Sequence, residues 1–256
     1  AVLEAQMLML QAHNILNPAN GAPITVPAQD MVLGLYYITK LRKGAKGEGL
    51  TFYGPEEALI AYNEGKVDIH AIINVVAKDL DENGNIVDKM IKETSVGRVI
   101  VNEIVPAEVG YLNTIVSKKS LRDIISDVIK AVGVARACEF LDGIKNLGYQ
   151  MAFKGGLSFN LGDIIIPKEK EELVKRGNEE IEQIMMNYNM GFITDNERYN
   201  QVIDTWTHVN SDLSDILYKT IKNDDQGFNS VFMMLDPGAR GSKEQIRQLS
   251  GMRGLM

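Results

Sequence analysis

The longest hydrophobic stripes of the chain have helical spacing. From residue 117 apolar residues recur three and four positions apart, which predicts a helix capped by Ser120 and ended by Gly133. A second helix is predicted from about residue 134 to 147, with Gly148 as its stop. The apolar positions of the first helix are Leu121, Ile124, Ile125, Val128, Ile129 and Val132.

Residues 168–222 carry the clearest pattern, that of two helices joined by a short turn. Gly191 closes the first helix, and Thr194-x-x-Glu197 is a capping box for the second. In the second helix the apolar steps alternate between four and three, a seam typical of packed helix pairs. The seam comprises Val202, Trp206, Val209, Leu213 and Ile216. The sequence therefore predicts a long antiparallel helical hairpin.

The segment between residues 50 and 95 reads as a small antiparallel sheet. Gly54-Pro55-Glu56-Glu57 starts a helix, because proline suits the first turn and carboxylates complement the helix dipole. Residues 67–77 are rich in β-branched side chains, and Asn83-Gly84 is a hairpin turn before a returning strand, 86–94. With further helices expected over residues 1–16 and from Asp30, the fold class is α+β, mostly α.

Composition and charge limit the function classes. The chain has 256 residues, 45% of them hydrophobic, and a net charge of -7, which argues against a free-standing, non-specific nucleic-acid binder. The single cysteine, Cys138, excludes an internal disulfide and a multi-cysteine zinc site and favours a reducing compartment. No apolar run is long enough for a membrane span. Neither end has a cap or a clear stop, so a piece of a longer chain is expected.

Most motifs of the chain are explained by local structure rather than by a functional site. Asp79-x-Asp81-x-Asn83-Gly84 imitates half a calcium loop, but Met90 stands where a bidentate glutamate is needed. The glycines at 44, 47 and 49 lack the lysine of a phosphate loop. Trp206 on the hairpin seam is expected in the core rather than in a stacking site, as is Cys138. The histidines have no ligand spacing; they are His13, His70 and His208.

The last 20 residues are basic and carry the candidate chemistry. Arg240, Lys243, Arg247 and Arg253 stand against Glu244 alone. In Gly238-Ala-Arg-Gly-Ser242 an arginine lies between glycines just before a predicted helix, 243–250. Backbone amides, a helix N-terminus and a guanidinium together suit a phosphate. A simple capping turn explains the same residues equally well.

Several long strings resemble the family of bacterial RNA polymerase β′ subunits. They follow one another in order over nearly the whole chain. They are Asn14-Ile-Leu-Asn-Pro-Ala-Asn-Gly21, Pro27-Ala-Gln-Asp-Met-Val-Leu-Gly-Leu-Tyr-Tyr37, Thr94-Ser-Val-Gly-Arg98, Glu197-Arg-Tyr-Asn200, Phe228-Asn-Ser230, and the run from Gly238 through Gln245-Ile-Arg-Gln-Leu-Ser-Gly-Met-Arg-Gly-Leu-Met256.

The resemblance implies a place in the polymerase near its active centre. The family's Asn-Ala-Asp-Phe-Asp-Gly-Asp loop, which holds Mg²⁺, is not in this sequence, so neither a catalytic residue nor a metal ligand is expected here. The chain resembles the pore and funnel regions that wall the secondary channel. Expected segments are 1–30, the end of the active-site region; 31–160, a pore-like α+β domain; 161–235, the funnel hairpin; and 236–256, leading toward the bridge helix.

By the same resemblance, individual residues acquire expected roles. Arg240, Arg247, Gln248, Asn20 and Gln29 match positions near the incoming nucleotide. Arg198, Tyr199, Asn200 and Asp204 match the rim where coiled-coil regulators dock. Gln201 stands where well-studied relatives have lysine, which weakens the case for a guanosine tetraphosphate site.

Implied partners are the other polymerase subunits, template DNA, the RNA 3′ end, nucleoside triphosphates and secondary-channel transcription factors, with no membrane and a cytoplasmic, nucleoid-associated location. The alternative is a non-catalytic helical protein-interaction module.

Overall fold

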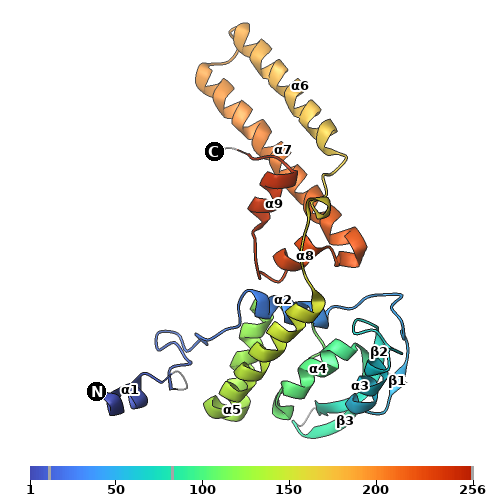
Figure 1. Ribbon diagram of the computed structural model, residues 1–256. Coiled ribbons are helices and arrows are strands. Elements are labelled where there is room, and N and C mark those ends of the chain that lie inside the picture. The colour runs from blue at the N-terminus through green and yellow to red at the C-terminus, as the bar shows by residue number, and fades with distance from the viewer. Residues whose placement is uncertain (11–12, 82–83, 255–256) are drawn as a thin grey trace. The chain divides into compact units, whose positions relative to one another are not determined.

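The computed structural model describes residues 1–10, 13–81 and 84–254 (Figure 1). The chain divides into two compact units. The first comprises Ala1–Leu157 and Asp236–Ala239, and the second comprises Ser158–Leu235 and Arg240–Met256. The chain therefore leaves the second unit briefly, at Asp236, and returns to it at Arg240.

The first unit holds a small sheet and most of the shorter helices. Its elements are α1 (Val2–Leu8), α2 (Asp30–Thr39), β1 (Thr51–Phe52), α3 (Pro55–Asn63), β2 (Ile73–Leu80), β3 (Ile86–Thr94), α4 (Val96–Ile104), the 3₁₀ turn η2 (Ala107–Val109) and α5 (Lys118–Gly155). The second unit is helical. Its elements are η3 (Leu161–Asp163), α6 (Lys170–Asn189), α7 (Asp195–Asn223), η4 (Asp224–Gly227), α8 (Ser230–Leu235) and α9 (Lys243–Ser250).

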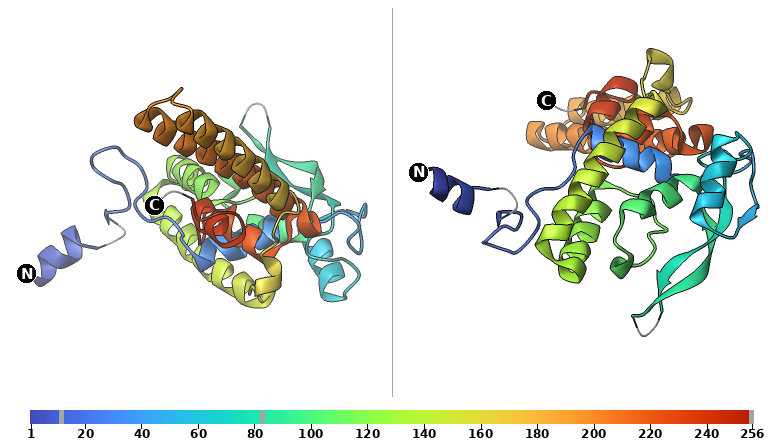
Figure 2. Two further views of the ribbon diagram at one scale, coloured as in Figure 1. Left: turned by 90° about the horizontal axis from the view of Figure 1, so that it is seen from above. Right: turned by 60° about the horizontal axis from the view of Figure 1, so that its bottom comes forward.

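The expected fold class, α+β and mostly α, is confirmed, but the sheet is mixed. β2 and β3 pair antiparallel, as the sequence predicts, and Figure 2 (right) shows them as one long two-stranded ribbon. β1 adds a short parallel strand on the other side of β2. Gly84 has φ +77°, as a tight turn requires, whereas Asn83 of the predicted turn lies outside the described residues.

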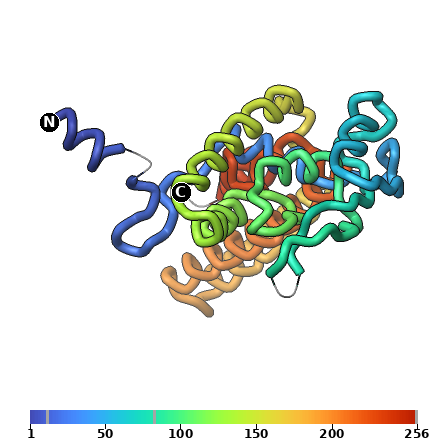
Figure 3. The backbone as a smooth tube through the Cα atoms, turned by 90° about the horizontal axis from the view of Figure 1, so that it is seen from below, coloured from blue at the N-terminus to red at the C-terminus, as the bar shows by residue number. Residues whose placement is uncertain are grey.

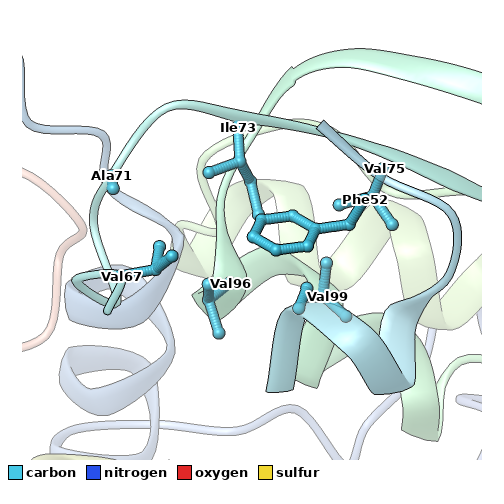
Figure 4. Packing of buried hydrophobic residues seen from close by; sticks show 8 residues of the cluster. Phe52, Val67, Ala71, Ile73, Val75, Val96 and Val99 are labelled. Atoms are coloured by element: carbon cyan, nitrogen blue, oxygen red, sulfur yellow. The ribbon is translucent and has the colours of Figure 1, made fainter. Parts of the chain in front are cut away.

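The predicted strand over 67–77 is wrong in its first half. Residues 66–72 form turns because local and tertiary hydrogen bonds use their backbone. The His70 backbone N donates to Asp68 Oδ1 two residues earlier, and the His70 carbonyl accepts from the remote Arg42 N. Val67 still packs into the buried cluster with Phe52 and Ile73, where the strands meet α3 and α4 (Figure 4). Burial alone therefore explains the apolar pattern there.

The helix predicted to stop at Gly148 continues to Gly155. Gly148 lies where α5 crosses α2, so its lack of a side chain serves close packing rather than termination. Gly133 does interrupt the helix, with φ +78°. The N-cap is Ser117, and Ser120 completes its capping box instead of capping the helix itself.

The N-terminal helix is shorter than the predicted 1–16, ending at Leu8, and none of its residues is buried. Among the residues that the structure describes, its apolar stripe packs against no core. Asp30 begins α2, as predicted, and most of that helix is buried. No sequence pattern predicted α4, whose N-terminus is capped by the Ser95 side chain.

The predicted hairpin is confirmed as α6 and α7, which run side by side (Figure 3). Thr194 and Glu197 form the expected capping box, and Gly191 has φ +77° at the turn. The seam shifts by one residue at its C-terminal end, where Leu217 is buried and Ile216 is not. Gly177 of α6 lets Trp206 and Val209 of α7 approach its backbone. No helix in the described part of the chain is both long and apolar enough to cross a bilayer.

Candidate functional site

The segment before α9 is a defined turn. The Ser242 Oγ accepts from Gln245 N at 3.3 Å, and the Gln245 Oε1 accepts from Ser242 N at 2.9 Å, a complete capping box. Gly238 and Gly241, on either side of Arg240, have φ of +71° and +81°, a region that favours glycine. The capping turn therefore exists, and it holds Arg240 between two fixed bends.

Arg240 and Gln248 share one pocket of the second unit. The pocket has a volume of about 410 Å³, and both side chains are exposed at its wall. Most of the remaining lining side chains are apolar, with the polar Gln245 beside them: Phe159, Ile164, Val231, Met234, Ile246 and Leu249. The Arg240 backbone N–H donates to the Met234 carbonyl at 3.0 Å, which fixes the start of the arginine side chain. A guanidinium and a carboxamide beside an apolar surface suit a ligand with both phosphate and ring components.

Arg247 lies on another side of α9. It forms an ion pair with Glu244 one turn earlier and lines cavities against α7 with Tyr218 and with Trp206. Adjacent helical positions point about 100° apart, so Arg247 and Gln248 do not face the same space. The structure therefore brings together two of the three expected nucleotide-proximal residues of this segment.

Asn20 and Gln29 belong to the first unit. The Asn20 Oδ1 accepts from Ala22 N at 3.1 Å in a turn closed by Gly21. Gln29 is the N-cap position of α2 and has φ +51°, an uncommon conformation for a residue other than glycine. Both side chains are exposed. The hydrogen bond within the turn explains why an asparagine stands at position 20. Gln29 is distinguished instead by its strained backbone conformation.

The expected regulator-docking residues lie in the first turns of α7. Tyr199, Asn200 and Asp204 are exposed, and the last two are one helical turn apart on the same face. Arg198 is tied down: it pairs with Asp195 at 2.8 Å, and its guanidinium lies 4.7 Å from the Tyr188 ring centroid. Within the described part of the chain, the other three side chains form no such ion pair or ring contact.

The turn between α6 and α7 also carries exposed apolar side chains, of which only Tyr199 was expected from the sequence. Met186 and Met190 near the end of α6, Phe192 in the turn and Tyr199 in α7 are 56%, 59%, 75% and 62% exposed. The capping box of Thr194 and Glu197 holds the helix start beside them, and the hydrogen bonds from Thr194 also lower the pKa of the Glu197 carboxyl. A rigid tip with exposed methionine and aromatic side chains is typical of a protein-binding surface.

The other candidate groups do not assemble into a metal site. Within residues 1–10, 13–81 and 84–254, no three His, Cys, Asp or Glu side chains cluster as ion ligands would. His70 is buried, its Nδ1 lies 3.0 Å from the Lys40 carbonyl oxygen, and burial lowers its pKa. Cys138 is only partly buried, so its expected core position is not borne out; its Sγ contacts the Val134 carbonyl.

Two sets of polar contacts that join distant segments were not predicted from the sequence. The Tyr36 hydroxyl of α2 donates to Asp236 Oδ2 at 2.8 Å, in the segment leading to Arg240. The buried Asn229 side chain binds Asp163 and Asp224 with its Nδ2 and caps α8 with its Oδ1. Tyr36 and Asp236 are 200 positions apart, so no local pattern indicates their contact. Asn229 follows a recognisable signal, an Asn-Ser pair before a short apolar run.

The sequence matches known proteins over almost its whole length. Residues 14–164 match the family described as RNA polymerase Rpb1, domain 3, and residues 193–256 match RNA polymerase Rpb1, domain 4. The first match alone covers more than half of the chain. The chain therefore belongs to the Rpb1 family of RNA polymerase subunits.

Within that family, its curated relatives are bacterial β′ subunits. The chain is 95% identical to DNA-directed RNA polymerase subunit beta' of Phocaeicola vulgatus, 85% to that of Bacteroides thetaiotaomicron and 57% to that of Flavobacterium johnsoniae. Each match includes the whole of this chain but only 18% of the relative. The resemblance noted in the sequence is thereby confirmed, and the chain spans less than a fifth of the length of these relatives.

Proposed function

We propose that this chain is part of the β′ subunit of a bacterial DNA-directed RNA polymerase, a nucleotidyltransferase that copies a DNA template into RNA. The proposal rests on membership of the Rpb1 family and on the β′ relatives that match over the full chain. In the assembled enzyme its partners are the other subunits, the template, the RNA 3′ end and nucleoside triphosphates, in the cytoplasm. Its own part is to wall the secondary channel through which nucleotides enter.

The observation that carries this role is the pocket shared by Arg240 and Gln248. A guanidinium can bind two phosphate oxygens at once, in a fork that lysine cannot reproduce. The Gln248 carboxamide supplies a donor and an acceptor on the same wall, and the apolar lining excludes water from part of the ligand. We assign these two residues to the incoming triphosphate. Asn20 and Gln29, in the first unit, remain proposed pore-lining residues, and Arg247 a supporting one.

We place the Mg²⁺ of the whole enzyme outside this chain. The described residues offer no cluster of three metal-ligating side chains, so they do not fit the ion. Held elsewhere in the polymerase, Mg²⁺ would supply charge stabilisation for the phosphoryl transfer. The residues of this chain would contribute only binding and orientation of the triphosphate.

Photo-crosslinking in the assembled polymerase tests the assignment. In one variant a benzophenone amino acid replaces Leu249, which lines the pocket. In a second variant it replaces Glu244, which lies on the side of α9 that faces α7. We expect radiolabelled nucleoside triphosphate to crosslink from position 249 and not from 244. Equal crosslinking from both, or from 244 alone, would show that the pocket does not face the nucleotide.

A second role is favoured by the tip of the α6–α7 hairpin. We propose that the exposed side chains of Tyr199, Asn200 and Asp204, beside the apolar tip, dock a coiled-coil transcription factor. As a protein dock this surface also serves the alternative reading, a non-catalytic interaction module. Gln201 on the same helix lacks the cation that a guanosine tetraphosphate site would use.

A further inference from the structure

We propose that Phe159 is a stacking platform for the base of the nucleotide whose phosphates Arg240 binds. The inference rests on the proposed function of Arg240 and deepens it, because it names the part of the ligand that the apolar wall of the pocket takes. Phe159, Arg240 and Gln248 line the same pocket of about 410 Å³, and all three belong to the second unit. An aromatic ring and a guanidinium thus border one space.

The Phe159 side chain is open to a ligand. It is 61% exposed and does not belong to the buried cluster that Leu217, Ile221 and Phe232 form in the same unit. Leu249, which lines the same pocket, is 68% exposed. Exposed apolar side chains that border one space, unlike scattered ones, are typical of a binding surface.

The backbone that carries Phe159 is held in place. In the turn that follows it, the Asp163 Oδ2 accepts from the Asn160 backbone N–H at 2.7 Å, and the Asn160 Oδ1 accepts from the Gly162 backbone N–H at 2.6 Å. The buried Asn229 side chain donates to the Asp163 carbonyl at 3.1 Å, which ties the turn to the start of α8. An aromatic side chain on a fixed backbone loses less conformational freedom on binding than one on a flexible loop.

The wall that carries the cation is fixed as well. The Arg240 backbone N–H donates to the Met234 carbonyl at 3.0 Å, and both residues line the pocket. A ligand that matches both walls has an anionic group for the guanidinium and a flat ring for Phe159. A nucleoside triphosphate has both, at the two ends of one molecule.

Stacking suits a site that has to accept every base. RNA synthesis uses four different nucleotides, and an aromatic ring does not select among them because every base has a π face. In the polymerase assembled with the full β′ subunit, we expect Phe159→Ala to raise the apparent nucleotide KM about 5- to 150-fold. The factor should be similar for all four nucleotides.

Matched variants separate stacking from simple apolar cover. Phe159→Tyr keeps the ring and should keep the KM, whereas Phe159→Leu keeps an apolar side chain without a ring and should resemble Phe159→Ala. Leu161→Ala is the control, because Leu161 is 87% exposed in the same turn and does not line the pocket; its KM should be unchanged. Since Phe159 is exposed, its truncation leaves no internal cavity, and the fold survives.

Inhibition by inorganic tripolyphosphate separates the ring contact from the phosphate contact. Tripolyphosphate has no base, so Phe159→Ala should leave its inhibition constant unchanged, whereas Arg240→Ala should raise both that constant and the nucleotide KM.

The inference would be overturned by an unchanged KM in Phe159→Ala, or by a wild-type KM in Phe159→Leu, while Arg240→Ala still raises KM. A tripolyphosphate inhibition constant that rises in Phe159→Ala as much as the KM does would overturn it too, because the phosphate contact would then be what was lost. If Arg240→Ala changes neither quantity, the proposed function of Arg240 fails, and this inference fails with it.

Discussion

Gly34 of α2 and Gly148 of α5 meet where the two helices cross, and the space between them has no room for a methyl group. A Cβ built on Gly34 would lie 2.0 Å from the Gly148 carbonyl oxygen and 2.7 Å from the Ala152 backbone N. Both obstacles are backbone atoms, which cannot rotate away. We expect Gly34→Ala to lower the free energy of unfolding by about 1–3 kcal/mol or more, measured by urea denaturation of the chain.

Gly54→Ala is the matched control. Gly54 has an extended backbone, with φ -168°, and no heavy atom within 4 Å of its added Cβ. Gly54 is the N-cap of α3, where alanine is a poorer cap than glycine, so its substitution should cost about 0.5–1 kcal/mol, less than Gly34→Ala. Equal losses for Gly34→Ala and Gly54→Ala would mean that the α2–α5 crossing is not as close as the structure has it.

Asn229 holds three segments of the second unit together. Its Nδ2 donates to the Asp163 carbonyl at 3.1 Å and to Asp224 Oδ2 at 2.9 Å, and its Oδ1 accepts from Val231 N and Phe232 N. Asn229→Ala should therefore cost about 2–4 kcal/mol in unfolding free energy, from lost hydrogen bonds and a lost helix cap. Asn178→Ala, on the exposed surface of α6, should be nearly neutral. Similar melting temperatures for the Asn229→Ala and Asn178→Ala variants would contradict the claim that Asn229 holds these segments together.

Burial of His70 makes stability depend on pH. Burial lowers its pKa from the ordinary 6.5, so below about pH 6.5 the unfolded chain binds a proton that the folded chain resists. Stability contributed by neutral His70 is complete above that value and is lost as the pH falls. Between about pH 7.5 and about pH 5.5 the loss from this group is at most about 1.4 kcal/mol.

Denaturation of variants at both pH values isolates that contribution. His70→Gln should remove part of the drop in unfolding free energy, whereas His208→Gln, on the exposed surface of α7, should retain all of it. A His70→Gln variant with the full drop would assign the pH dependence to other groups.

Asp204 tests the docking surface of the hairpin. In the assembled polymerase, Asp204→Ala should weaken the binding of a coiled-coil secondary-channel factor about 2- to 5-fold, as expected for one exposed charge contact. Basal elongation should be nearly unchanged, because the Asp204 side chain is exposed and is not one of the hydrophobic seam residues. Fluorescence anisotropy with labelled factor measures the affinity. The control is Glu182→Ala, which removes an exposed carboxylate of α6. An equal loss of affinity for the factor in this variant would show that net charge, and not a contact of Asp204, causes the effect.

Local signals predicted those helix boundaries that capping residues set, and failed where tertiary packing decides. Thr194 and Glu197 act on neighbours three residues away, so the sequence alone located the start of α7. Gly148 shows the opposite case: glycine ends many helices, but here it sits inside one because α2 needs close approach. Nothing in the residues around Gly148 distinguishes the two uses. The turns over 66–72 replaced a predicted strand for the same reason, since partners remote in sequence hold them.

The candidate site was predicted as a list of residues rather than as an arrangement. Family resemblance named Arg240, Arg247 and Gln248 together, and helix geometry then separates Arg247 from the shared pocket. The apolar lining residue Phe159 precedes α9 by more than 80 positions in the sequence, so no spacing rule connects it to Arg240. Roles at the nucleotide and at the docking surface remain predictions that the structure makes specific.

The most direct test of the account is the nucleotide dependence of RNA synthesis by the assembled polymerase carrying Arg240→Ala in β′. A fork of charge-assisted hydrogen bonds contributes about 1.5–3 kcal/mol, so the apparent nucleotide KM should rise roughly 10- to 150-fold. Arg240→Lys should recover only part of the affinity, because a point charge cannot reproduce the fork. An unchanged KM together with a lower melting temperature would contradict the account and leave Arg240 as a residue that merely stabilises its turn.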